Sequence, residues 1–373
     1  MHVAWVTNIP TPYRHHQYRR MHAVFASKGQ SVEIAYMAES EPGRHWKHAE
    51  ADFDYPHRFF AGIHPLIRGV VLHANPGLFA WLRRTPPDVL IVGGWASPSH
   101  LLAPLCVPKR TKRVLFVESH LTSVARKGAL AAAVKRGVIG AYDAYLTASE
   151  RAIELVTHLD PSAAGKPFHV LPNLIDGSKF VAKTPESTAA ARARLGVADD
   201  EVLLFTPARL EPFKGLDLAL PAFAGRQKLR WLIAGEGSKK ADYEATIARD
   251  RSPVTLLGQR PEAEIIGLLH AADVFFLPSR SDPAPLSVVE ATATGNPLLL
   301  SQRVGNLEQG LGDENGWSYD IEDPAALPAR LDAIQAEGRA GLAARGARSR
   351  ARYVAKFDSD RNVAALAEWL ATL

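Results

Sequence analysis

Two cations five residues apart follow an apolar segment in the second half of the chain. Arg209 and Lys214 lie in ARLEPFKG, one residue after VLLFT at 202–206. A guanidinium offers a planar fork of donors and an ammonium offers a compact charge, so the pair could neutralise a diphosphate without a metal ion. Such a pair is also common on solvated protein surfaces, and both interpretations stay open at this level.

Two carboxylates, Asp282 and Glu290, lie eight residues apart in PSRSDPAPLSVVEATATGNP. Pro285 disfavours helical angles in the residue before it and is tolerated in a first helical turn, which predicts a helix that begins near Pro285 or Leu286. The unpaired amides of that helix start, with the positive end of its dipole, would suit a phosphate group. Alternatively, Asp282 caps the helix and Glu290 faces water.

Glycines mark a third segment, WLIAGEGS, which contains Gly235 and Gly237. Glycine there either lets the backbone approach a ligand closely or simply forms a turn. A dinucleotide-binding domain would carry G-x-G-x-x-G after its first strand, but NIPTPY follows 2–7 and ARL follows 202–206. A P-loop sequence is also missing. These observations argue against NAD chemistry and against a nucleotide kinase or ATPase.

In their order along the chain, the three segments resemble the retaining family 4 glycosyltransferases of the GT-B fold. The family pattern is R-L-x-x-x-K-G after a strand, then G-x-G, then E-x7-E followed by A-x-x-x-G-x-P. The matching positions are Arg209–Gly215, Gly235–Gly237 and Asp282–Glu290, followed by Gly295 and Pro297. The match is specific across about 200–305. The first half matches more weakly, in its opening strand and turn and in LPNLIDGSKF at the domain junction.

The resemblance implies a role for each matched residue. Arg209 and Lys214 would bind the donor diphosphate and stabilise the charge on the departing nucleotide. Glu290 would hold the nucleotide ribose, and Asp282 would contact hydroxyls of the transferred sugar. Backbone at Gly258–Pro261 would meet the base. The donor-binding set is therefore Arg209, Lys214, Gly235, Gly237, Gly258, Arg260, Asp282, Ala284, Leu286, Ser287 and Glu290, of which Arg209, Lys214 and Asp282 are also catalytic candidates.

Two departures from the family pattern bear on the donor sugar. The first carboxylate is Asp282 rather than the commoner Glu and reaches roughly 1.5 Å less far. Pro283 and Pro285 replace residues whose amides often touch that sugar, and proline has no N–H to donate. The diphosphate site is little affected, whereas the sugar and the base, UDP or GDP, stay open.

The first half supplies acceptor-side candidates at the ends of predicted strands. They are Thr11, Tyr13, Arg14, Gly94, Trp95 and Glu118. The resemblance adds His120, in FVESHLTS, as a catalytic candidate, because related enzymes carry a His or Asp near this position, close to the reacting anomeric centre. A buried or capping role for His120 and plain packing for Trp95 are the alternatives.

Parallel sheets must position these side chains. Apolar segments recur at 2–7, 31–36, 88–92, 113–118, 143–148 and 168–172, and again at 202–206, 230–234, 254–257, 273–277 and 297–301, with helical stretches between them such as 14–28 and 98–105. This alternation predicts an α/β protein with sheets covered on both faces. With the resemblance, we expect two Rossmann-like domains facing an interdomain cleft. The acceptor-side domain would span 1–175, the nucleotide-sugar donor domain 176–355 and a C-terminal helix 356–373, which would pack back on the first domain; the linker would lie at about 174–190.

Composition agrees with a globular protein of two domains, since the 373 residues are 47% hydrophobic and 22% charged. Cys106 is the only cysteine, which excludes an internal disulfide and a cysteine-rich metal site and favours a core position. No apolar run reaches the roughly 18–20 residues of a spanning helix. The start, MHVAWVTNIP, is typical of a first strand rather than a signal peptide. We therefore expect a cytoplasmic protein.

Charge is unevenly spread, because residues 1–180 carry 21 Lys and Arg against 13 Asp and Glu. No nucleic-acid-binding motif accompanies this excess, so nucleic acid is not the expected partner. An anionic membrane surface or a phosphate-bearing acceptor fits better. Residues 123–140 predict a basic, Ala-rich helix, although its four charges spread around the helix instead of forming one stripe. A solvated helix is the alternative, and we expect peripheral association with the inner face of the membrane.

The function predicted from these points is a retaining glycosyltransferase that uses a UDP- or GDP-linked sugar and a glycan or lipid-linked acceptor. It would act in cell-envelope polysaccharide or glycolipid synthesis, with no metal or other cofactor, because cationic side chains and a helix start would take the place of the ion. One rival is a nucleotide-sugar 2-epimerase of similar fold, which would need acid–base carboxylates at other positions. Another is a non-catalytic nucleotide-sugar-binding protein, against which the presence of Arg209, Lys214 and Glu290 together argues.

Overall fold

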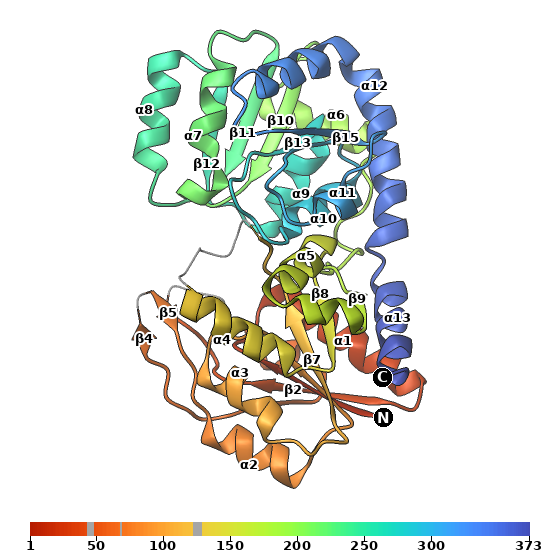
Figure 1. Cartoon of the computed structure of the whole chain (residues 1–373). Helices are drawn as coiled ribbons and strands as arrows, with labels where there is room; N and C mark the ends of the chain where they lie inside the picture. The colour runs from red at the N-terminus through yellow and green to blue at the C-terminus, as the bar shows by residue number, and fades with distance from the viewer. Residues whose placement is uncertain (43–47, 68, 122–128) are drawn as a thin grey trace. The chain divides into compact units, whose positions relative to one another are not determined.

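The computed structural model describes residues 1–42, 48–67, 69–121 and 129–373, with the backbone alone for 129–134. Contacts between Cα atoms divide the chain into two units (Figure 1). Unit 1 is Met1–Asp176 with Ser359–Leu373, and unit 2 is Gly177–Asp358. The expected borders lay after residues 175 and 355.

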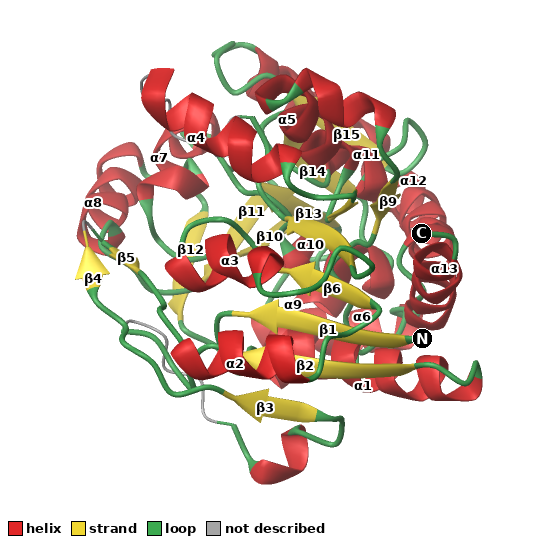
Figure 2. Cartoon of the chain, turned by 60° about the horizontal axis from the view of Figure 1, so that its bottom comes forward, coloured by secondary structure: helices red, strands yellow, loops and turns green. Residues whose placement is uncertain are grey.

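Unit 1 is built on a seven-stranded parallel sheet in the order β3-β2-β1-β6-β7-β8-β9. Its strands are β1 (His2–Thr7), β2 (Ser31–Tyr36), β3 (His57–Phe59), β6 (Val89–Val92), β7 (Lys112–Val117), β8 (Ala144–Thr147) and β9 (Phe168–Val170). Figure 2 shows β3, β2, β1 and β6 side by side. All residues of β6 and β8 are buried, as expected of strands in a sheet covered on both faces. The six strands predicted in this half are confirmed, and β3 was missed.

Unit 1 also contains α-helices, of which the first and the fifth contact strands of this sheet. These helices are α1 (Pro12–Ser27), α2 (Pro76–Arg84), α3 (Pro98–Leu102), α4 (Ala129–Gly140), α5 (Glu150–Leu159) and α13 (Ser359–Ala371); β4 (Leu66–Ile67) and β5 (Val70–Val71) form a small hairpin. The C-terminal helix α13 packs against α1 (Figure 1). Ion pairs join the two helices, Arg20 with Asp360 and Lys28 with Glu368. The last helix thus belongs to the first unit.

Unit 2 contains a six-stranded parallel sheet in the order β12-β11-β10-β13-β14-β15. Its strands are β10 (Val202–Pro207), β11 (Leu229–Ala234), β12 (Val254–Gly258), β13 (Val274–Leu277), β14 (Leu298–Ser301) and β15 (Gly316–Tyr319). The five predicted strands are present within a residue or so of the expected bounds. The sixth, β15, was missed because GWSY is short and lacks an apolar run.

The helices of unit 2 are α6 (Pro185–Leu195), α7 (Leu216–Ala219), α8 (Lys240–Asp250), α9 (Glu262–Ala271), α10 (Leu286–Thr294), α11 (Leu307–Gly310) and α12 (Ala326–Lys356). A capping box starts α6, in which the Ser187 amide donates to Thr184 Oγ1 and the Thr184 amide donates to Ser187 Oγ. This helix begins inside the segment expected to be the linker, so the unstructured connection is shorter than expected. In α12 the helix is broken at Gly338.

Each unit has its own aromatic core. In unit 1, Trp5 makes edge contacts with Tyr18 and Phe116, with ring centroids 5.6 and 5.2 Å apart. In unit 2, Trp231 stacks on Phe223 at 4.7 Å and satisfies its indole N–H on a buried threonine. Cys106 is buried in the core of unit 1, as predicted.

The described residues include no helix that is both long and apolar enough to cross a membrane. The basic helix predicted at 123–140 corresponds to α4, which is described from Ala129. Residues 123–128, with Arg126 and Lys127, lie outside the described residues, so the predicted charge distribution is only partly visible.

Candidate functional site

Four neighbouring strands of unit 2 end at one edge of the sheet, close to residues predicted to bind the donor. In the order β12-β11-β10-β13, Gly258 ends the first strand, Gly235 follows the second, Arg209 follows the third and Asp282 lies in the loop after the fourth. Parallel strands place their carboxyl ends at the same edge, where α/β sheets bind ligands. The topology therefore gathers these residues at one edge of unit 2.

The loops after β10 and β13 are joined at Phe213. Its carbonyl oxygen accepts hydrogen bonds from the amides of Arg280, at 2.8 Å, and Ser281, at 3.2 Å. Gly215 has a φ of +66°, and a Cβ atom there would lie 2.2 Å from the carbonyl oxygen of Pro278. Only glycine allows this close approach, so the K-G pair fixes the position of its lysine against the end of β13.

Gly235 and Gly237 are explained by contact between two loops of the protein. A Cβ atom on Gly235 would lie 1.9 Å from the carbonyl oxygen of Ala208, and one on Gly237 would lie 2.4 Å from that of Leu210. The Leu210 amide also donates to the Glu236 carbonyl at 2.9 Å. These glycines hold the loop after β11 against the loop after β10, whether or not a ligand approaches them.

Lys214 and Asp282 form an ion pair in which only 12% and 13% of the side chains are exposed. The Asp282 backbone pairs with Val304 in a parallel bridge, and its carbonyl accepts from the Gly305 amide at 2.8 Å. The alternative in which Asp282 is the N-cap residue of α10 is wrong, since that residue is Pro285, which makes no side-chain cap hydrogen bond. The Asp282 carboxylate therefore holds the Lys214 ammonium at this edge of the sheet.

Arg209 is exposed and lies over the ring of Phe213, with its guanidinium carbon 5.1 Å from the ring centroid. Lys214 Nζ lies 5.6 Å from the same centroid. In the described part of the chain, Arg209 makes no ion pair, and an aromatic face orients a cation without neutralising it. Phe213 was not predicted, although an aromatic residue between two cations in ARLEPFKG was the available signal.

Two other cations at this edge are already paired. Arg260 donates to the Leu257 carbonyl at 3.0 Å and to Glu264 at 3.3 Å. Arg280 forms a two-pronged pair with Asp217, with both N···O distances at 2.6 Å. Arg260, predicted as a donor-binding residue, therefore offers less uncompensated charge than Arg209 does.

The helix α10 begins at Leu286 after Pro285, as predicted. Its first amides, including that of Ser287, have no carbonyl four residues earlier within the helix, so they carry the positive end of the dipole. Asn306 Nδ2 donates to the Pro285 carbonyl at 3.1 Å and holds the turn, and half-buried Ala284 precedes it. The structure places this helix start on the same loop as Asp282.

Glu290 lies one turn further along α10 and is half-buried. Burial, and after it the carboxylate of Glu262, raise the pKa of Glu290 to about 7. Near neutral pH this side chain is close to its own midpoint and can either donate or accept a hydrogen bond. Hydroxyl donors would favour its ionised form.

A pocket of about 430 Å³ lies in unit 1 at the carboxyl ends of β1, β6 and β7. The structure brings all six predicted acceptor-side residues to its wall: Thr11, Tyr13, Arg14, Gly94, Trp95 and Glu118. Residues from three separate turns meet there because these strands are neighbours in the sheet.

The charge of Arg14 in this pocket is already compensated. Its Nη2 lies 2.7 Å from Glu118 Oε1, and its Nη1 donates to Gln17 at 2.6 Å. Burial is the largest single effect and opposes the guanidinium charge, but the Glu118 carboxylate together with Tyr13 and Tyr18 outweighs it, and the pKa of Arg14 lies above its ordinary value. Burial, and next Glu118, raise the pKa of Tyr13. The pocket wall thus presents the neutral hydroxyl of Tyr13 and the half-exposed carboxylate of Glu118, whereas the positive charge of Arg14 is already paired.

Several polar residues of this pocket were not predicted. Glu41 accepts from Asn8 Nδ2 at 3.2 Å and lies 2.9 Å from Nε2 of buried His73. His100 is 2% exposed, and burial, followed by His73, lowers its pKa to about 3. Its Nε2 has no hydrogen-bond partner among the described residues. No local motif links positions 41, 73 and 100, so only the tertiary structure shows them together.

His120 is placed beside this pocket rather than in its wall. It is 2% exposed and follows Ser119, which lines the pocket, whereas His120 does not. Its catalytic role therefore stays a prediction drawn from the resemblance.

Residues 187–349, which include Arg209, Lys214 and the segment from Asp282 to Glu290, match the family described as Glycosyl transferases group 1. The matched stretch is less than half of the chain. The group 1 segment lies within unit 2 and contains its whole candidate site.

Relatives of the chain are also named as sugar transferases. A D-inositol 3-phosphate glycosyltransferase of Segniliparus rotundus is 31% identical over 212 residues, which are 51% of this chain and 46% of the relative. A GDP-mannose-dependent monoacylated alpha-(1-6)-phosphatidylinositol monomannoside mannosyltransferase of Corynebacterium glutamicum is 32% identical over 153 residues, which are 37% of this chain and 39% of the relative. The chain thus spans less than half the length of these relatives.

Solved structures extend the comparison to both units. Anabaena HepE in complex with UDP has a TM-score of 0.75 and 18% identity, covering 100% of each chain. A glycosyltransferase from Rickettsia africae also has a TM-score of 0.75, with 12% identity and coverage of 100% and 98%. The predicted GT-B fold is confirmed.

Proposed function

We propose that the chain is a glycosyltransferase that moves a sugar from a nucleoside diphosphate donor to a hydroxyl of a glycan or lipid-linked acceptor. The observation that carries this proposal is the arrangement at the sheet edge of unit 2. Arg209, Lys214 and the start of α10 converge there within a segment that matches Glycosyl transferases group 1. The sequence lacks the glycine motif of NAD-binding domains and the P-loop of nucleotide kinases and ATPases.

In the proposed reaction, the bond between the anomeric carbon and the diphosphate oxygen breaks, and negative charge grows on the departing phosphate. Arg209 meets this charge directly because it is exposed and forms no ion pair with a carboxylate among the described residues. Lys214 is held by Asp282 and adds a second positive charge. Preorganised donors of this kind stabilise a developing charge without an ion, so we propose metal-independent transfer.

Glu290 would hold the ribose of the nucleotide. Glu290 lies one turn along α10, so it does not occupy the helix start, where the phosphates would bind. Its half-buried carboxyl group can accept hydrogen bonds from two adjacent ribose hydroxyls. Asp282, still paired with Lys214, would offer its second oxygen to a hydroxyl of the sugar.

Relatives and the pocket of unit 1 support the donor and acceptor classes that we propose. HepE has been solved with UDP and with UDP-glucose, and the mannosyltransferase of C. glutamicum is named for GDP-mannose. The Glu41 and Glu118 carboxylates and the compensated Arg14 suit a hydroxyl-rich acceptor group. We therefore propose a sugar or polyol acceptor in envelope polysaccharide or glycolipid synthesis, with retention of the anomeric configuration.

A donor screen tests the proposal. Thermal stability would be measured with a panel of UDP- and GDP-linked sugars, and the best donor would be incubated with and without glycan and polyprenyl- or inositol-linked acceptors. Release of free nucleoside diphosphate together with a glycosylated product is expected. A donor epimer formed without acceptor would instead identify an epimerase, and tight binding with no turnover would identify a binding protein.

A further inference from the structure

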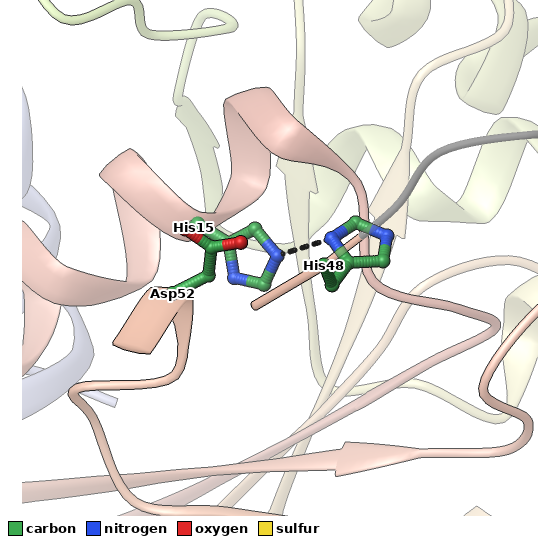
Figure 3. Close-up of side chains that lie close together, drawn as sticks. All are labelled: His15, His48 and Asp52. Atoms are coloured by element: carbon green, nitrogen blue, oxygen red, sulfur yellow. Dashed lines mark hydrogen bonds between the residues drawn. The ribbon is translucent and has the colours of Figure 1, made fainter. Parts of the chain in front are cut away.

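A second group of polar side chains lies in unit 1, outside the pocket. His15 projects from α1, and His48 and Asp52 come from the segment before β3 (Figure 3). Their ligand atoms all lie within 4.8 Å of one another. His15 Nε2 and His48 Nδ1 are 2.8 Å apart, as the dashed line shows. Two imidazoles and a carboxylate thus converge on one point.

The buried member of this group is oriented by a chain of tyrosines. His15 is 5% exposed, and its Nδ1 lies 2.7 Å from the hydroxyl of Tyr55, which is 2.7 Å from that of Tyr36. Phe53 packs edge-on against the His15 ring at 4.7 Å. When Nδ1–H donates to Tyr55, the lone pair of Nε2 faces His48. A histidine ligand held through its other nitrogen is typical of metal sites.

The remaining two members of the group are partly exposed to solvent. His48 and Asp52 are half-buried, so the group opens towards solvent on their side. One Asp52 oxygen accepts from the Ala49 amide at 2.8 Å, which anchors the carboxylate and leaves the other oxygen available. Tetrahedral zinc separates two nitrogen ligands by about 3.3 Å, so the histidine pair needs to open by only about half an ångström.

We propose that His15, His48 and Asp52 bind a divalent transition metal ion of the zinc type, with water in the fourth position. Imidazole ligands favour such ions over Ca²⁺ and Mg²⁺, which prefer all-oxygen sites. The ion would fasten the segment before β3 to α1 in unit 1. None of these three residues lines the pocket or belongs to the group 1 segment, so this site is separate from the proposed sugar transfer.

The test is a zinc titration of the full chain after removal of any histidine tag and of bound metal with a chelator. Competition with a chromophoric chelator would report stoichiometry and affinity. One equivalent is expected to bind, and His48→Gln and Asp52→Asn should each weaken binding by at least about tenfold. Both positions are half-buried, so these variants should fold, which circular dichroism would verify. Cobalt would give an independent signature, because its visible absorption depends on the ligands.

Matched controls come from this segment and from the start of β3. Asp54→Asn removes a carboxylate that pairs with Arg19 at 2.6 Å, and His57→Gln removes an imidazole that contacts Phe53. Both controls should bind zinc like the wild type. Failure of the wild type to bind one equivalent would overturn the proposal and leave a plain His–His hydrogen bond. Equal binding by all variants would do the same. Sugar transfer by Asp52→Asn, measured separately, keeps this outcome distinct from that of the proposed function.

Discussion

Lys214 and Asp282 are 68 residues apart in the sequence and form an ion pair in the structure. The pair joins the loop after β10 to the loop after β13, and both side chains are largely buried. Removing either partner would leave the other charge poorly solvated, which costs stability as well as function. Arg209 is exposed and outside this pair, so it is the cleaner probe of the phosphate site.

Arg209→Ala should lower turnover roughly 100-fold or more, since the loss of one preorganised donor to a developing charge costs a few kcal/mol. Lys214→Ala should lower turnover similarly and also lower the melting temperature. Steady-state kinetics with the best donor would measure the first effect and calorimetry the second. Arg249→Ala, which removes a cation paired with Asp250 on α8, is the matched control. Unchanged turnover in both site variants would refute the assignment of the donor site.

Glu290 should make stability depend on pH. Its pKa rises to about 7 in the folded protein, so between its ordinary value of 4.5 and pH 7 the folded chain holds a proton that the unfolded chain has lost. Stability should therefore fall as pH rises through that window, by about 3 kcal/mol, and level off above it. Urea unfolding of the wild type and Glu290→Gln would measure the difference. Glu244→Gln, at an exposed position on α8, is the control, and an identical pH dependence in all three proteins would contradict the shift.

Nucleotide affinity should also depend on pH through Glu290, but it should increase as pH rises. Ribose hydroxyls that donate to Glu290 favour its ionised form, so affinity for the nucleoside diphosphate should tighten several-fold from pH 6 to pH 8. Isothermal titration at both pH values would show it. The trend should vanish in Glu290→Gln, and a wild type with pH-independent affinity would argue against ribose contact.

Transfer is expected to continue in the presence of a strong chelator. Arg209, Lys214 and the start of α10 supply positive charge without an ion, so added magnesium or manganese should change the rate little. The Asp52→Asn variant separates this result from loss of zinc at the other site. If chelation stopped transfer in that variant and magnesium or manganese restored it, the proposed strategy would be wrong.

The new glycosidic bond should keep the donor's anomeric configuration, as the resemblance to retaining enzymes implies. Proton magnetic resonance of the product, recorded early enough to precede mutarotation, would give the coupling of the anomeric proton. An inverted product would contradict the expectation. It would instead indicate a carboxylate that acts as a general base on the acceptor hydroxyl.

Unit 1 is expected to bind anionic membranes in a salt-dependent way. Arg83 and Arg84, exposed in the last turn of α2, remain available, whereas Arg19 and Arg20 are compensated by Asp54 and Asp360. Each cation near an anionic surface contributes about 1 kcal/mol, and salt screens it. Co-sedimentation with anionic and neutral vesicles would measure this, and replacing both Arg83 and Arg84 with Gln should weaken binding. Negligible binding to anionic vesicles at low salt would point to a soluble acceptor.

The sequence by itself determined the architecture and most of the donor edge. Buried parallel strands require continuous apolar runs, which are visible in any short window, so β10 to β14 were predicted almost to the residue. Proline chemistry placed the start of α10 at Leu286. These features follow from rules that act within a few residues.

Only the tertiary structure decided which side chains meet. The Lys214–Asp282 pair, the position of Phe213 beside Arg209, the union of Glu41 with the pocket of unit 1, and the group formed by His15, His48 and Asp52 all join residues from separate turns. Strand order in the two sheets sets these meetings, and strand order depends on long-range packing that leaves no trace in local residue patterns. The shifted pKa of Glu290 belongs to the same class, because burial and a neighbouring carboxylate exist only once α9 and α10 have packed.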